Sequence, residues 1–143
     1  MNATNPIHPV RDATSEPYWQ AAQLRKLLIQ QCPATGKYQW YPRAHSIHAP
    51  GQQPVWVEAS GRGTVFSYST IHRGNGPRRP PYTCAVVALE EGVLFLATLK
   101  DVAEDDIAIG MPVVVDFETI DETLSLPFFK PAHAAMPVAE ATS

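Results

Sequence analysis

The second half of the chain is a succession of short extended segments separated by turn residues, and this pattern restricts the fold more than any other feature. Glu90, Glu91 and Gly92 form a tight turn between the second and third segments, and residues 103–107 form a helical turn between the third and fourth. Five strands with one short helix after the third predict a mainly β protein, a five-stranded OB-fold barrel. The five segments, rich in β-branched and aromatic residues, are 64–71, 82–89, 93–99, 111–118 and 124–129.

The first half of the chain predicts a short helix followed by a hairpin. Ser15 can cap a helix and Pro17 is tolerated in its first turn, so we expect a helix that ends near Arg25. Residues 26–31 and 38–41 are extended, with a Pro-Ala-Thr-Gly turn between them. The expected organisation is a disordered arm at 1–14, the helix and hairpin at 15–54, the barrel at 55–131 and a disordered tail at 132–143.

Composition argues against several classes of protein. The formal net charge of −3 does not favour a nucleic-acid partner, because such proteins usually carry a basic excess. No apolar run approaches the roughly 20 residues of a membrane-spanning helix, and residues 1–12 contain no apolar signal core. We therefore expect a cytoplasmic protein that does not contact membranes, with Cys32 and Cys84 as reduced thiols.

A series of short motifs, in a specific order between about residues 15 and 131, resembles a known family. The motifs are Pro17-Tyr18-Trp19, residues 27–32, residues 36–43, Trp56-Val57-Glu58, residues 60–65, Pro81-Tyr82, residues 109–113 and residues 126–131. They resemble the zinc-ribbon and OB-fold acyl-CoA-associated proteins, the family of the domain of unknown function thirty-five. The resemblance implies a helix, a rubredoxin-like ribbon and an OB barrel, in an accessory subunit that serves acyl-CoA enzymes, thiolase-like ones in particular.

The ribbon of that family holds zinc with two Cys-x-x-Cys knuckles, and these fall on Cys32, Thr35, Ser46 and Ala49. Only Cys32 keeps a ligating side chain, whereas structural zinc needs about four thiolate or imidazole ligands. We therefore expect a degenerate ribbon without zinc and no other cofactor. An alternative is a three-ligand metal site made by His45 and His48 with Cys32.

The loop after the first barrel strand is the best candidate for ligand binding. It carries His72, Arg73, Arg78 and Arg79 among glycines and prolines. Guanidinium groups suit the phosphates of CoA or the carboxylates of a partner, although an ordinary solvated loop explains the pattern as well. Single-stranded nucleic acid is another alternative, which would use Phe66 and Tyr68 as a stacking platform.

No arrangement of nucleophile, base and orienting group is visible, so we expect a non-catalytic protein. Cys84 could act as a nucleophile, but a mid-strand position favours a buried structural thiol. The sequence and the resemblance together predict an accessory subunit docked on a thiolase-like or other acyl-CoA enzyme, and the alternative is a stand-alone CoA or acyl-CoA binder. The expected docking residues are aromatic: Tyr18, Trp19, Tyr38, Trp40 and Tyr41.

Overall fold

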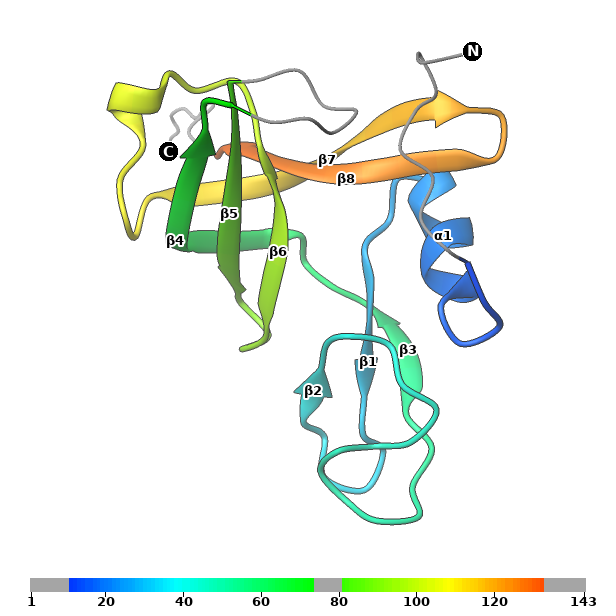
Figure 1. Ribbon diagram of the computed structural model, residues 1–143. Coiled ribbons are helices and arrows are strands. Elements are labelled where there is room, and N and C mark those ends of the chain that lie inside the picture. Colours follow the sequence, from blue (N-terminus) through cyan, green and yellow to red (C-terminus); the bar gives the residue numbers. More distant parts are fainter. Residues whose placement is uncertain (1–10, 74–80, 133–143) are drawn as a thin grey trace, which may run out of the picture.

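The structure, a computed structural model, describes residues 11–73 and 81–132. It confirms the mainly β class, with one short helix and two sheets (Figure 1). No helix within these ranges is long and apolar enough to span a membrane. The elements are α1 (Glu16–Gln23), β1 (Leu28–Gln31), β2 (Tyr38–Gln39), β3 (Val55–Glu58), β4 (Arg62–Ile71), β5 (Tyr82–Leu89), β6 (Leu94–Leu99), a 3-10 turn (Glu104–Asp106), β7 (Pro112–Asp121) and β8 (Leu124–Pro131).

The five strands expected from the sequence close into a barrel in the order β4-β5-β6-β8-β7. All neighbours are antiparallel except β6 and β8, which run parallel and pair only at Thr98↔Phe128 and Leu99↔Phe129. Pairing is long between β4 and β5, β5 and β6, and β7 and β8, whereas β4 meets β7 at three residue pairs and β6 meets β8 at two.

The strand β3 belongs to the ribbon and not to the barrel. Residues 55–58, which the sequence placed at the start of the barrel, pair antiparallel with β1 to complete a three-stranded sheet in the order β2-β1-β3. In Figure 1 this sheet forms a lobe below the barrel, while α1 lies beside β7 and β8. The pairing is long-range, since the loop between β2 and β3 separates the partners.

The register of the β4–β5 pairing shifts between Val65 and Ser67, beyond Gly61 and Gly63. A Cβ built at Gly63 would lie 2.5 Å from the Ala88 carbonyl oxygen. Close approach of β4 and β5 therefore requires glycine at this position.

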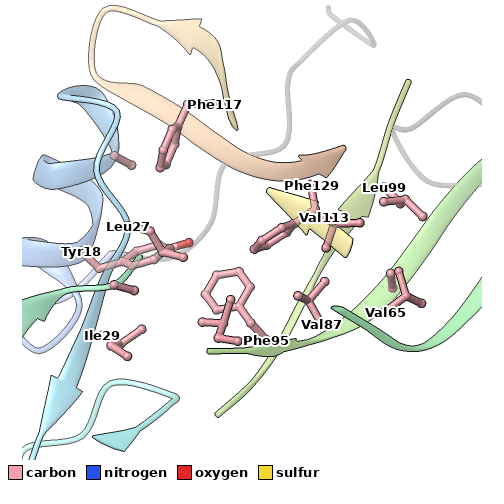
Figure 2. Close-up of a cluster of buried hydrophobic side chains, with 14 of the residues drawn as sticks. Tyr18, Leu27, Ile29, Val65, Val87, Phe95, Leu99, Val113, Phe117 and Phe129 are labelled. Carbon is pink, nitrogen blue, oxygen red and sulfur yellow. The ribbon is translucent and has the colours of Figure 1, made fainter. Parts of the chain in front are cut away.

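One continuous apolar core joins the barrel to the helix and the ribbon. Val87, Phe95 and Phe129 lie in the barrel, whereas Tyr18 and Ile29 extend the same cluster sideways to α1 and β1 (Figure 2). The two lobes therefore bury a shared surface, which fixes the ribbon against the barrel.

Candidate functional site: the junction of helix, ribbon and barrel

An aromatic cluster connects the three parts of the molecule. The ring of Trp40, from the ribbon, lies 4.7 Å from that of Phe95 on β6 and 4.9 Å from that of Tyr18 on α1, between ring centroids. Phe95 in turn meets Phe129 of β8 at 6.0 Å. The cluster lies near the point where β6 and β8 diverge, so aromatic packing joins the ribbon and the helix to the barrel beside this seam.

A cavity of about 450 Å³ lies against this cluster. Trp19, Trp40 and Tyr41 form its wall on the helix and ribbon side, and the barrel contributes Leu96 and Pro127 among other residues. None of the residues lining it in the described part of the chain is charged. The cavity therefore suits an uncharged, largely apolar group.

The expected docking residues differ in accessibility. Tyr41 is 58% exposed and stacks on Trp40, and Trp19, Tyr38 and Trp40 are half-buried. Tyr18 is only 5% exposed, and burial raises the pKa of its hydroxyl. Tyr18 therefore packs against Trp40 and offers little side-chain surface to a partner.

Cys84 is also different from the expectation. Its thiol was interpreted as a buried structural group, but the residue is half-buried and lines the cavity. It alternates along β5 with the fully inward Ala85 and therefore faces outward. The alternation of side chains along β5 indicates that Cys84 and Ala85 face opposite sides of the sheet. It does not show which of the two sides is covered.

The arginine-rich loop is described only at its beginning. His72 and Arg73 are exposed, while Arg78 and Arg79 lie outside the described residues. The His72 Nε2 lies 3.3 Å from a carboxylate oxygen of Glu104. Glu104 was expected only to begin a helical turn, and it also meets the base of this loop.

The ribbon brings together the first three positions that were aligned with zinc knuckles. Cys32 is fully buried, and hydrogen bonds from the hydroxyls of Ser46 and then Thr35 lower the pKa of its thiol to about 7. Ala49 lies in the same loop as Ser46 and offers no donor side chain. Within residues 11–73 and 81–132, no three His, Cys, Asp or Glu side chains gather around a possible metal position.

The two loop histidines do not join Cys32. The ring of His48 bonds through Nε2 to the Tyr38 carbonyl at 2.8 Å, and His45 is exposed while its backbone carbonyl accepts a bond from Gln39. The described geometry therefore does not form the alternative three-ligand site of His45, His48 and Cys32.

Two buried glutamines, which sequence reasoning missed, hold the ribbon loop. Gln39 Nε2 donates to Gln30 Oε1 at 2.8 Å, and the same oxygen accepts the Arg43 amide at 2.8 Å. Gln39 Oε1 accepts the Ile47 amide at 2.9 Å. The pair, hereafter the glutamine clasp, fastens residues 43–47 to the hairpin.

Comparison with known proteins identifies the family. Residues 19–46 match the ChsH2 rubredoxin-like zinc ribbon domain, and residues 56–118 match the ChsH2 C-terminal OB-fold domain. A solved chain of the Ltp2-ChsH2(DUF35) aldolase is 36% identical, with a TM-score of 0.81 over 87% of this chain and 99% of that one. The protein therefore belongs to the ChsH2-type DUF35 family of zinc-ribbon and OB-fold proteins.

Two curated relatives carry names that bear on function. The "Probable enoyl-CoA hydratase alpha subunit" of Thermomonospora curvata is 39% identical over 80% of this chain. The "DUF35 domain-containing scaffold protein" of Methanocaldococcus jannaschii is 34% identical over 46% of this chain. The chain covers only 36% of the first relative and 48% of the second.

The match to a zinc ribbon corrects the expectation that the chain carries no zinc, since a rubredoxin-like zinc ribbon indicates zinc binding. The donors in the described ribbon are one thiol and two hydroxyls, which do not fit a four-ligand thiolate or imidazole site. No step of the function proposed below passes through a metal.

Proposed function

We propose that this protein is a non-catalytic accessory subunit that docks on an enzyme of acyl-CoA metabolism. The observation that carries the proposal is the aromatic group of half-buried Trp19 and Trp40 and exposed Tyr41, hereafter the docking surface, beside a cavity whose described lining carries no charge. Aromatic residues that are packed against buried neighbours, as Trp40 is against Tyr18 and Phe95, are typical anchors of protein interfaces. The family supports the enzyme class, because relatives are named as a hydratase alpha subunit and a scaffold.

The contacts of the histidine rings support a non-catalytic role for the described residues. His48 bonds to a backbone carbonyl and His72 to a carboxylate. Within the described ranges, neither ring forms a hydrogen bond to a hydroxyl or thiol. Nucleophilic catalysis by serine, threonine or cysteine with histidine needs such a bond between nucleophile and base. Cys84 faces the cavity, but its proposed role is to line the apolar wall.

The proposed partner is the larger, catalytic subunit. A thiolase-like enzyme is the one implied by the family resemblance, and the named relatives add a hydratase and an aldolase to the candidates. All three act on CoA thioesters in this proposal, and the accessory subunit would complete or steady the substrate site.

Co-expression with the acyl-CoA enzyme encoded nearest to the chain tests the proposal. Tyr41→Ala should weaken the complex by about 2 kcal/mol if Tyr41 is a central anchor. Ile47→Ala is the matched control, because both side chains lie on the ribbon and both are 58% exposed. Equal affinity of the two variants, measured by calorimetry, would remove the docking surface from the proposal.

The acyl-transfer and hydratase activity of the isolated chain gives a second readout. We expect no turnover of acyl-CoA by the chain alone and restored turnover in the complex. Turnover by the isolated protein that disappears in Cys84→Ala would overturn the non-catalytic role.

We further propose that the loop beginning at His72 and Arg73 contacts CoA phosphates or partner carboxylates, together with Arg78 and Arg79. Both described residues are exposed at one end of the barrel, where OB-folds commonly bind ligands. A triple Ala variant of the arginines should bind CoA or partner more weakly, with a loss that shrinks at high salt. Arg62→Ala, also exposed on the barrel, is the control. Unchanged affinity for both ligands would exclude the loop.

A further inference from the structure

Strand β6 has one edge that is largely unpaired. Its six residues, Leu94–Leu99, pair with β5 along one edge, whereas β8 meets the other edge only at Thr98 and Leu99. Within the described residues, no other strand pairs with the segment Leu94–Ala97. Unpaired strand edges are sites where another extended chain can add.

The pairing register shows which backbone groups face that edge. The Leu89 amide donates to the Val93 carbonyl at 2.9 Å, so these two residues form a hydrogen-bonded pair at the β5–β6 turn. Hydrogen-bonded and non-bonded pairs alternate in an antiparallel ladder. Phe95 and Ala97 therefore bond to β5, and the amide and carbonyl groups of Leu94 and Leu96 point toward the free edge.

An independent contact agrees with this register. The Lys100 amide donates to the Phe129 carbonyl of β8 at 2.8 Å, on the side of the strand away from β5. Since amide direction alternates along a strand, the even-numbered residues of β6 share this direction. The edge is thus occupied by β8 at its end and open along Leu94 and Leu96.

The open edge borders the cavity described above. Phe95, Leu96 and Ala97 line it on the β6 side and Pro127 lines it on the β8 side. The side chains of Leu94 and Leu96 are 48% and 56% exposed. Because none of the described residues that line the cavity is charged, the electrostatics favour an uncharged occupant and disfavour the phosphates of CoA.

We propose that β6 accepts an extended, uncharged segment of the partner enzyme as an added strand, whose alternate side chains enter the cavity beside the docking surface. Backbone hydrogen bonds to Leu94 and Leu96 give the segment its direction, and the aromatic wall selects apolar side chains. This deepens the proposed function and rests on it only in assigning the segment to an acyl-CoA enzyme.

Two substitutions at one residue separate backbone addition from side-chain contact. Leu96→Pro removes an amide on the free edge, a position where proline is tolerated because no ladder bond is lost. Leu96→Val keeps the amide and a β-favouring apolar side chain. Circular dichroism and the melting temperature establish that both variants are folded.

The first measurement uses the co-expressed complex. We expect Leu96→Pro to raise the Kd at least about tenfold and Leu96→Val by less than about threefold. Hydrogen exchange should show the amides of Leu94 and Leu96 exchanging freely in the isolated wild-type chain and slowly in the complex. A complex that forms without protecting these amides overturns the strand addition while leaving the accessory role in place.

The second measurement needs no partner and so tests the strand addition even if the accessory role fails. The wild-type chain is titrated, with NMR detection, with a panel of end-capped peptides in which Val, Leu or Phe alternates with Ser or Thr. Saturable shifts and slowed exchange at Leu94 and Leu96 support the proposal. No binding across the panel overturns it, as does protection of the same amides by self-association, which would make a second copy the occupant.

Discussion

The side-chain amide of Gln39 donates to Oε1 of Gln30 across 2.8 Å in the interior of the ribbon, and both residues are 2% exposed. Each amide also bonds to the backbone of the following loop, at Arg43 and at Ile47. A buried amide is costly without partners, so two mutually satisfied glutamines specify one loop conformation. The glutamine clasp thereby positions Ser46 over Cys32.

Replacing one member of the clasp should destabilise the ribbon. Gln39→Ala leaves the Ile47 amide without its partner and removes one of the two donors to Gln30 Oε1, which we expect to lower the free energy of unfolding by about 2 kcal/mol. Gln53→Ala, at an exposed position before β3, should change it by less than about 0.5 kcal/mol. Urea unfolding followed by tryptophan fluorescence measures both. Equal effects would mean that the clasp contributes no more than a surface residue.

The aromatic cluster makes a second prediction. Trp40→Ala removes the ring that contacts Tyr18 and Phe95, and we expect a loss of about 2–3 kcal/mol of unfolding free energy. Tyr41→Ala truncates a largely exposed ring and should cost less than about 1 kcal/mol. Thermal unfolding of the two variants gives the comparison. A Tyr41→Ala loss as large as that of Trp40→Ala would show that burial does not distinguish the two rings.

Ionised Asp116 should stabilise the folded protein, so that the free energy of unfolding falls as the pH becomes acidic. Its carboxylate accepts Lys130 Nζ at 2.8 Å and the Phe117 amide at 2.8 Å, and it pairs with Arg25. The hydrogen bond from Lys130, with those other groups, holds the pKa of Asp116 below its ordinary value of 3.8. Since the native pKa is depressed, the stabilisation is complete above the unfolded value and is lost as pH falls through the native one.

Asp116→Asn is the corresponding measurement. We expect the variant to be about 1 kcal/mol less stable than the wild type at neutral pH, with the difference shrinking as pH falls through the depressed native pKa of Asp116. Asp105→Asn, on the exposed 3-10 turn, should show no such dependence. A stability difference for Asp116→Asn that persists unchanged into acid would refute the link to its ionisation.

Local patterns in the sequence predict most strands of the fold. They do not predict pairing between segments that are far apart in the chain. Runs of β-branched and aromatic residues bounded by turn residues located all five barrel strands, since these signals depend on neighbours in the chain. The pairing of β3 with β1 depends on how the loop from Pro42 to Pro54 folds, which no local pattern contains.

The candidate site was predicted in part for the same reason. Aromatic residues could be singled out by type, but only packing distinguishes buried Tyr18 from exposed Tyr41. Gln30 and Gln39 look like surface residues in the sequence, because glutamine is mostly exposed and its burial depends on partners from the distant loop. The expectation that zinc is absent was wrong because it counted ligands at four positions, whereas the match to the zinc-ribbon family extends over residues 19–46.

The close approach of β4 and β5 at Gly63 makes the last prediction. A Cβ at this position would lie 2.5 Å from the Ala88 carbonyl oxygen and 2.7 Å from Val87 Cγ1. The carbonyl belongs to the β4–β5 ladder, where Thr64 pairs with Ala88, so it cannot move without disturbing the barrel. Gly63→Ala should therefore lower the free energy of unfolding by about 2–3 kcal/mol, as overpacking does in a close-packed interior. Thr64→Ala, one residue along the same strand and exposed, should cost under about 1 kcal/mol. If chemical unfolding showed Gly63→Ala to be as stable as the wild type, the strands would have to separate there at little cost, and glycine would not be required for barrel closure.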